Sequence, residues 1–161
     1  MDYNEVFREL YLQKVEYLLC GGLAVNIYGI PRMTADIDVL LNFEEVNINS
    51  FKAVIQKFGY SPALPLNLSE MQDEAKRVYY KNERNLIAYS FVSLQRNQMT
   101  VDVLIDTPIN FNLLWDRKET RKTTDYEMYI VSVEDLINLK KHANRVQDQK
   151  DVILLSQLLK Q

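Results

Sequence analysis

The sequence is poor in the residues and runs that several common types of protein need. Its 161 residues include one cysteine, Cys20, and one histidine, which excludes an internal disulfide and a zinc site built from cysteine and histidine. A net charge of −3 excludes the strong basic excess of proteins that coat nucleic acid, although a local basic patch is compatible with it. No apolar run approaches the roughly 20 residues that cross a bilayer, and the N-terminus lacks the order of a secretory signal. We therefore expect a cytoplasmic protein without a membrane partner.

What is present is typical of a folded domain: 47% of the residues are hydrophobic and 25% are charged. There is no linker rich in proline and glycine and no internal repeat, so we expect one domain over residues 1–161. Its catalytic core would cover about residues 1–110, and a helical part about residues 132–160.

Hydrophobic periodicity and turn residues predict the order of the secondary structure. The predicted helices cover residues 1–15, 23–28, 51–58, 69–81, 132–143 and 148–159. The predicted strands cover residues 16–20, 36–41, 86–94, 99–105 and 126–131, with a hairpin turn at 95–98 and a loop at 61–68. This order indicates an α/β or α+β fold, in which helices cover one side of a mixed sheet and a helical cap follows at the C-terminus.

Two aspartates stand in one of these predicted strands. Asp36 and Asp38 are two residues apart in the run DIDVLL, so their side chains share one face while Ile37 and Val39 enter the other. Aspartate is depleted in strands, and two neighbouring carboxylates repel unless a cation lies between them. A divalent metal with oxygen ligands is the natural cation. The alternative is that both residues line the solvated face of an ordinary strand.

A further aspartate, Asp102, lies in the strand predicted over residues 99–105. If this strand lies beside the strand of Asp36 and Asp38, three carboxylates come together and could hold two Mg²⁺ ions for phosphoryl chemistry. One polar face on a strand is common, so a solvated position is an equal alternative for Asp102. Asp106 is a rival third ligand, but Thr107 and Pro108 next to it favour the start of a turn.

A pair of glycines, Gly21 and Gly22, separates a buried predicted strand from a short helix. Without side chains there, phosphate oxygens can approach the backbone N–H groups at the start of the helix. A tight strand-to-helix turn is the simpler interpretation. The spacing favours phosphate binding, because the chain returns after the helix directly to Asp36 and would place a triphosphate beside a metal.

These residues resemble a known signature. The run GGLAVNIYGIPRMTADID, from Gly21 to Asp38, is similar to that of the nucleotidyltransferase superfamily with the DNA polymerase β fold. It is most similar to the AbiEii/AbiGii toxin-like and minimal nucleotidyltransferases. The resemblance implies that Asp36, Asp38 and Asp102 bind metal and that Gly21 and Gly22 contact a nucleoside triphosphate.

The same resemblance extends to two further parts of the chain. Arg32 and Thr34 match the family's Arg-x-Thr-x-Asp-x-Asp run, and Arg32 is expected either to assist phosphate binding or to lie solvated in a loop. The tail from Val131 to Lys140 matches an Asp-Leu-Ile-x-x-Lys helix, which makes Lys140 either a triphosphate contact or a helix-surface lysine. Arg145, Asp148 and Asp151 match a further element, with Gln147 in place of the usual lysine, and favour a structural ion network.

The function implied is metal-dependent transfer of a nucleoside monophosphate from an NTP, such as ATP or GTP, to an acceptor hydroxyl. The acceptor stays open between a tRNA end, a protein hydroxyl and a small molecule. One alternative is an antitoxin-like module that regulates a partner in a toxin–antitoxin pair, and another is a nucleotide-binding protein without turnover. His142 is expected at the surface, and Cys20 is expected to be buried and unreactive.

Overall fold

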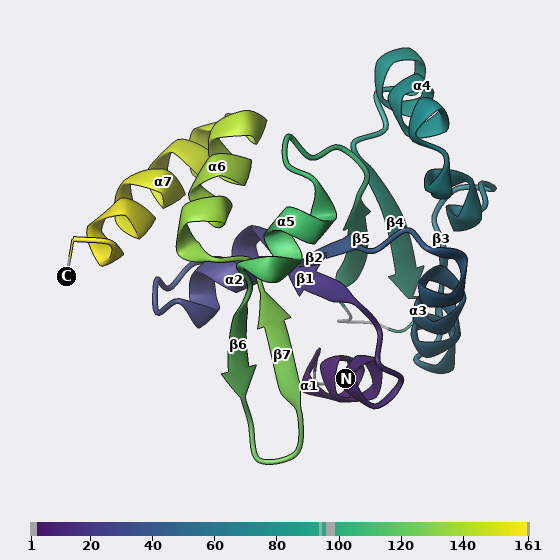
Figure 1. Ribbon diagram of the computed structural model, residues 1–161, viewed down its shortest axis with the longest axis horizontal. Helices are drawn as coiled ribbons and strands as arrows, with labels where there is room; N and C mark the ends of the chain where they lie inside the picture. The colour runs from purple at the N-terminus through teal and green to yellow at the C-terminus, as the bar shows by residue number, and fades with distance from the viewer. Residues whose placement is uncertain (1–2, 94, 96–98, 161) are drawn as a thin grey trace.

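Seven strands form one mixed sheet in the computed structural model, which describes residues 3–93, 95 and 99–160 (Figure 1). The strands are β1 (Tyr17–Leu19), β2 (Asp36–Leu41), β3 (Tyr60–Pro62), β4 (Ala88–Ser93), β5 (Thr100–Leu104), β6 (Glu119–Lys122) and β7 (Glu127–Ile130). The helices are α1 (Tyr3–Leu12), α2 (Gly21–Ile27), α3 (Glu45–Lys57), η1 (Leu68–Gln72), α4 (Glu74–Arg84), α5 (Phe111–Asp116), α6 (Val133–Ala143) and α7 (Val146–Leu158). Within these residues no helix is long and apolar enough to span a membrane.

The order of the strands across the sheet is β3-β4-β5-β2-β1-β7-β6. At its centre β2 pairs with β5 in parallel and with β1 in antiparallel orientation. β4 and β5 are the two antiparallel strands predicted from the sequence, and β5 lies directly beside β2. Part of the predicted hairpin turn, residues 96–98, lies outside the described residues.

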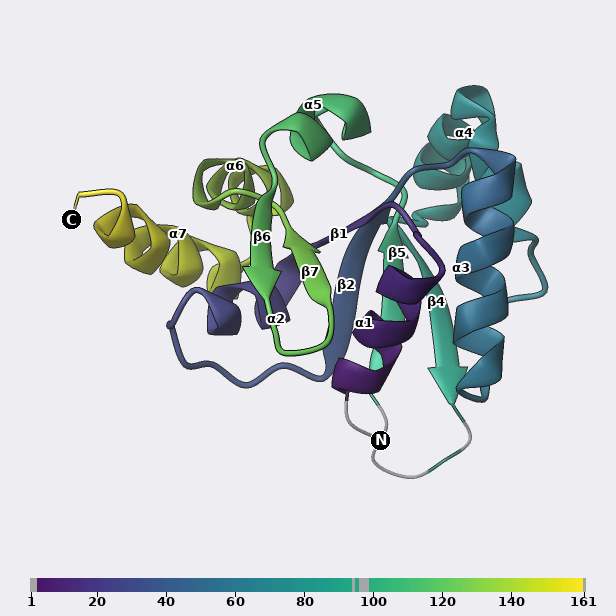
Figure 2. The ribbon, with the colours of Figure 1, turned by 60° about the horizontal axis from the view of Figure 1, so that its bottom comes forward.

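One face of the sheet is covered by α1 and α3 (Figure 2). Phe51 of α3 contacts Phe91 of β4 with ring centroids 5.9 Å apart, and Phe7 of α1 stacks on Tyr17 of β1 at 5.6 Å. Phe91 aligns through Val101 with Ile37 of β2, so the covered face is the one that carries Ile37. The alternation along β2 and β5 therefore leaves the aspartates on the opposite face.

The predicted elements differ from the observed ones where polar residues hide a boundary. α3 begins at Glu45 rather than at residue 51, because its first turn is mostly exposed, Val46 included, and only Ile48 there is buried. The helix predicted over residues 69–81 is divided at Asp73, whose side chain accepts hydrogen bonds from the first turn of α4. α2 begins at Gly21, two positions before the predicted start.

Two strands were not predicted at all. β3 contains Pro62 and lies at the edge of the sheet, where a missing N–H is tolerated. β6 is a polar edge strand at the other side, and its pairing with β7 alone gives it strand geometry. Neither segment has the apolar alternation that a sequence-based prediction needs.

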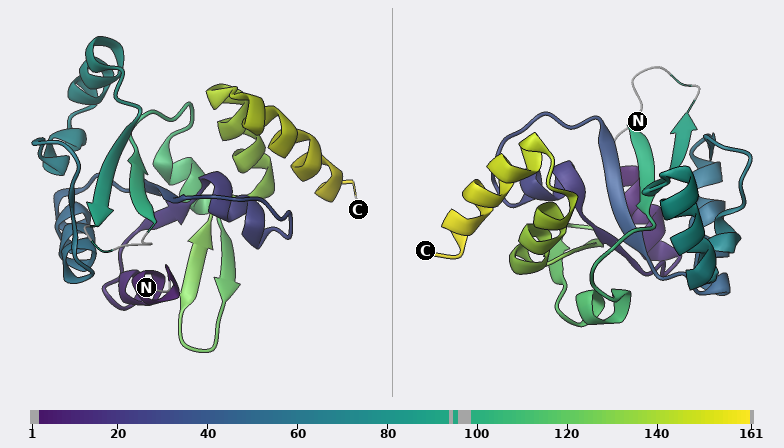
Figure 3. Two further views of the ribbon diagram at one scale, coloured as in Figure 1. Left: turned by 180° about the vertical axis from the view of Figure 1, so that it is seen from behind. Right: turned by 90° about the horizontal axis from the view of Figure 1, so that it is seen from above.

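The helices α6 and α7 lie at one end of the molecule, and α3 and α4 at the other (Figures 1 and 3).

A buried ion network joins α6 to α7. Lys140 of α6 is only 4% exposed, and its Nζ lies 2.7 Å from Asp151 Oδ2 and 3.2 Å from Asp148 Oδ1. Asp151 also pairs with Arg32 in the loop before β2, and Arg145 Nε lies 2.7 Å from Asp148 Oδ2. The network joins the helical end to the loop before β2. The sequence predicted a structural ion network of Arg145, Asp148 and Asp151, but not that Lys140 and Arg32 take part in it.

Asp151→Ala is expected to lower the free energy of unfolding by about 3–5 kcal/mol, because it removes the shared partner of two cations, one of them buried. Urea unfolding measures this loss. The control is Asp125→Ala, at an exposed carboxylate in the turn before β7, which should change stability by less than about 0.5 kcal/mol. Equal effects of the two substitutions would contradict the proposed importance of the network.

Candidate active site

Asp36, Asp38 and Asp102 lie on the face of the sheet that α1 and α3 leave uncovered. The parallel register of β2 and β5 pairs Asp38 directly with Asp102, while Asp36 pairs with Thr100. Neighbouring strands are about 4.8 Å apart, so the Asp38 and Asp102 side chains project from adjacent positions. All three aspartates are partly buried. The structure thus brings together the three residues that the sequence singled out.

The electrostatics of this cluster are unfavourable for unpaired carboxylates. Burial raises the pKa of the Asp38 carboxyl, and the negative charges of Asp102 and Asp36 raise it further, against smaller opposing effects of the Gly22 amide and Arg145. Burial also raises the pKa of Asp102, against the opposing effect of a hydrogen bond with Ser90 and with a smaller contribution from the charge of Asp36. A positive charge placed among them would relieve both effects.

The donors of this cluster fit a divalent cation in their chemistry. Carboxylate oxygens are the ligands that Mg²⁺ prefers. The Oδ1 atom of Asp102 is buried and has no hydrogen-bond partner among the described residues, so a ligand here would satisfy it. As the side chains stand, however, no three acidic, histidine or cysteine residues in the described ranges form a group that could hold a metal ion. The aspartates therefore match a divalent cation in their oxygen donors and in their position on the sheet, and their present side-chain arrangement does not form a coordination group.

Gly21 packs against Asp38 in a way that requires glycine. Its φ is +63°, a conformation that other residues adopt at a cost, and a Cβ atom there would lie 1.8 Å from Asp38 Oδ2. The first residue of α2 therefore touches a carboxylate of the cluster with bare backbone. This contact explains why position 21 requires glycine.

The loop before β2 folds over the second glycine. A Cβ on Gly22 would lie 2.7 Å from Thr34 Oγ1 and 3.1 Å from Arg32 Cζ, so both side chains lie against the start of α2. Arg32 is held by Asp151, and its backbone N–H donates to Asn26 Oδ1 at 2.8 Å. Thr34 Oγ1 donates to the carbonyl of Asp36 at 3.3 Å. Arg32 and Thr34 thus border the aspartate cluster, and Arg32 is not a freely solvated loop residue.

Lys140 is not the helix-surface lysine that one of the two sequence interpretations described. It is buried beneath α7 and paired with two carboxylates, rather than lying on a helix surface. Arg145, whose side chain is 71% exposed, is held by Asp148 and is close enough to Asp38 to lower the pKa of that carboxyl. The exposed guanidinium, which the sequence assigned to a structural network, therefore also contributes positive potential to the site.

The remaining candidates are accounted for by their surroundings. Burial would raise the pKa of Asp106, but hydrogen bonds with Lys81 and His142 outweigh it and lower the pKa. Asp106 is thus paired with side chains and makes a poor rival for Asp102. Burial raises the pKa of the Cys20 thiol, which keeps it protonated and unreactive, as predicted.

The structure adds a cavity that the sequence did not indicate. It has a volume of about 700 Å³ and lies where β2 and β5 end, between the loop after β2, α4 and the segment from β5 to α5. We call it the strand-end pocket, with Glu44, Arg77, Lys81, Asn82, Leu104 and Asn112 in its wall. Most of these residues belong to segments that match no motif. In the structure, α4 beside this cavity has no buried residue.

A mixed sheet with paired aspartates beside a glycine turn defines this protein as one with a nucleotidyltransferase fold. A crystal structure of a candidate nucleotidyltransferase from Thermotoga maritima has the same fold, with a TM-score of 0.55 and 15% identity over 99% of this chain and 94% of that one. The family model described as nucleotidyl transferase AbiEii toxin of type IV toxin–antitoxin systems matches residues 8–153. The chain belongs to this family and is a nucleotidyltransferase. No curated protein matches it.

Gly21→Ala is expected to destabilise the protein by more than about 1 kcal/mol and to displace Asp38, because it combines a left-handed backbone with a clash. Gly29→Ala is the matched control, since Gly29 has a φ of +89° but no atom within 4 Å of the added Cβ. Urea unfolding compares the two. A smaller loss for Gly21→Ala than for Gly29→Ala would show that the contact with Asp38 is unimportant.

The pH dependence of stability should reveal the raised pKa of Asp38. As the pH rises past 3.8, the ordinary pKa of an aspartate carboxyl, the unfolded chain loses the Asp38 proton while the folded chain still holds it. Stability attributable to Asp38 therefore falls as the pH rises through the raised pKa. Asp38→Asn removes this effect, so the variant should gain on the order of 1 kcal/mol relative to the wild type between pH 4 and 7. Urea unfolding in EDTA measures the difference in the free energy of unfolding. If this free energy changes with pH in the same way in Asp38→Asn and in the wild type, the raised pKa of Asp38 does not affect stability.

Proposed function

We propose that this protein transfers a nucleoside monophosphate from an NTP to an acceptor hydroxyl and releases pyrophosphate, with dependence on Mg²⁺. The observation that carries the proposal is the register of β2 and β5, which sets Asp38 opposite Asp102 on the face that also bears Asp36. The orphaned Oδ1 of Asp102 and the contact of Gly21 with Asp38 support it.

In this proposal Asp36 and Asp38 would hold two Mg²⁺ ions, and Asp102 would hold the one nearer the acceptor. Bound Mg²⁺ would supply neutralisation of negative charge and polarisation of phosphate and hydroxyl oxygens. The carboxylates themselves orient the reactants rather than act as nucleophiles. As the acceptor oxygen forms its bond to the α-phosphorus, the bond from that phosphorus to the bridging oxygen breaks, pyrophosphate leaves, and the hydroxyl proton passes to solvent.

The triphosphate would bind along the start of α2. Gly21 and Gly22 carry no side chains of their own there, Gly21 lies against Asp38, and Thr34 and Arg32 lie against Gly22. Lys140 would act on the triphosphate as a nearby positive charge, and a direct contact requires that it leave one of its two carboxylates. Such a site accelerates transfer by orientation and by stabilising charge.

The biological setting follows from the family. Its description names the toxin of a toxin–antitoxin system, which favours an active enzyme over an antitoxin-like module. We therefore propose an antitoxin as a partner, ATP or GTP as the nucleotide and the cytoplasm as the place of action.

Asp36→Asn is expected to reduce transfer at least about 100-fold, because it removes a ligand and a charge at the reacting centre. The measurement incubates the protein with each labelled NTP, Mg²⁺ and an extract of RNA and protein, and records which fraction gains label. Asp125→Asn, at an exposed turn, should label as the wild type does. Omission of Mg²⁺ should abolish labelling. A wild-type protein that binds NTP but labels nothing would identify a protein without turnover and refute the proposal.

A further inference from the structure

The helix α7 carries its side chains in an unusual order, with carboxylates toward the protein and aliphatic side chains toward solvent. Its buried residues are Asp148, Asp151 and Leu155, and both aspartates are held in the ion network of Lys140. Its exposed large apolar side chains are those of Val146, Ile153 and Leu154, with exposed fractions of 74%, 62% and 41%. A surface helix ordinarily buries its apolar side and exposes its charged side. The apolar side of α7 is therefore left without a partner within the described residues.

The exposed side chains of α7 form one continuous face. We call it the outer face of α7, and it consists of Val146, Lys150, Ile153, Leu154 and Gln157. These positions are spaced by four, three, one and three residues, so they lie on one side of the helix, and the first and third are about 10 Å apart along its axis. β-branched residues are weaker helix formers than alanine, lysine or glutamate, so helix propensity does not explain valine and isoleucine at solvated positions. Their spacing is the one by which two helices pack side by side.

Every exposed charge along α7 is positive. Arg145, at the start of the helix, is exposed, and so are Lys150 within the outer face and Lys160 at its end. The acidic residues of the same segment are the two buried aspartates. The whole chain has a net charge of −3, so this positive character is local and opposite to that of the rest of the protein. A binding partner for this face should therefore be negatively charged.

The aliphatic side chains favour a protein over RNA as this partner. Bases of single-stranded RNA stack on aromatic side chains, and the sequence from Arg145 to Lys160 contains no aromatic residue. Exposed aliphatic side chains are stabilised when another apolar surface removes them from water. A second copy of α7 would supply an apolar surface, but it would also bring a second set of the same cations against the first, which costs free energy.

We infer that the outer face of α7 binds an acidic, amphipathic helix of a partner protein. Apolar side chains of that helix pack on the aliphatic residues of the face, and its carboxylates pair with the lysines and with Arg145. The inference rests on the proposed function for the existence of a partner, and it does not depend on the transfer reaction. Arg145 is close enough to Asp38 to lower the pKa of that carboxyl, so a bound acidic helix lies next to the candidate active site.

Fluorescence anisotropy with a labelled, designed peptide tests this assignment. The probe is a helical peptide of about 18 residues, with leucines at the a and d heptad positions, glutamates beside them and alanines elsewhere. One control peptide has lysines in place of the glutamates, and another has serines in place of the leucines. The probe should bind the wild type at least about tenfold more tightly than either control. If the probe does not bind, or if either control binds equally well, the inference is wrong.

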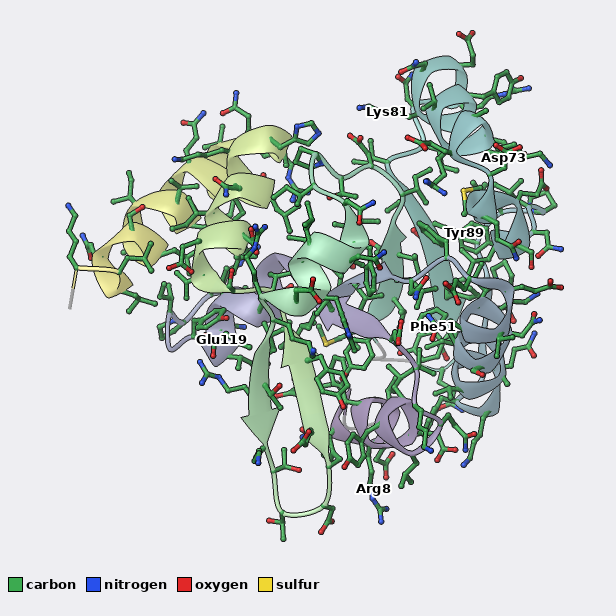
Figure 4. All side chains as sticks on the ribbon, in the orientation of Figure 1. Arg8, Phe51, Asp73, Lys81, Tyr89 and Glu119 are labelled. Carbon is green, nitrogen blue, oxygen red and sulfur yellow. The ribbon has the colours of Figure 1, made fainter. Side chains whose placement is uncertain are left out.

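Substitutions in the outer face locate the binding. Ile153→Ser should weaken binding of the probe at least about fivefold, because it removes an apolar contact. Lys150→Glu should weaken it by a similar factor at low salt and by less at high salt. The matched control is Arg8→Glu, which changes the net charge by the same amount on α1, away from α7 (Figure 4), and should alter the affinity less than about twofold. Equal effects of Lys150→Glu and Arg8→Glu would contradict a specific face and overturn the inference.

Two further outcomes would assign the face to another occupant and overturn the inference. One is displacement of the probe by single-stranded RNA, and the other is a dimer of the wild type that Ile153→Ser abolishes in sedimentation experiments. The inference and the proposed transfer can fail separately. Asp36→Asn should bind the probe as the wild type does. If the probe binds but the wild type transfers no label from any NTP, the transfer is refuted and the docking face stands. If label is transferred but no probe binds, the transfer stands and the docking face is refuted.

Discussion

The site depends on the parallel pairing of β2 with β5. This pairing sets Asp38 opposite Asp102 and forces like charges together on one face, while the hydrophobic side chains of the same strands pack under α3 on the other. A shift of one residue would turn the aspartates into the core, so the burial of Ile37, Val101 and Val103 enforces the register. The protein therefore uses its hydrophobic core to hold an electrostatically unfavourable cluster in place.

Two further features hold the surroundings of that cluster. Gly21 approaches Asp38 so closely that no side chain fits between them, and the ion network of Lys140 attaches the helical end to the loop carrying Arg32 and Thr34. The network also holds Arg145 near Asp38. Arg32 and Arg145, which are far apart in the sequence, are thus held beside the glycine turn and near Asp38.

The two ends of the β2–β5 pair differ in character. Near the glycine turn, Gly21 lies against Asp38, and Thr34 and Arg32 lie against Gly22, whereas the wall of the strand-end pocket carries Arg77 and Lys81 together with carboxylates and carboxamides. Asp106, which the sequence offered as a rival metal ligand, instead joins Lys81 of α4 and His142 of α6 across this end.

The strands of the three aspartates, the glycine turn and the helix from Ser132 to Ala143 could be predicted from the sequence, because alternation, glycine and capping residues are local signals. The family could be predicted too, through motifs that keep their spacing. Four features became visible in the folded molecule alone: the register of β2 against β5, the burial of Lys140, the edge strands β3 and β6 and the pocket beside α4. Each of these joins residues distant in the chain or lacks an apolar pattern, and long-range packing alone fixes such contacts.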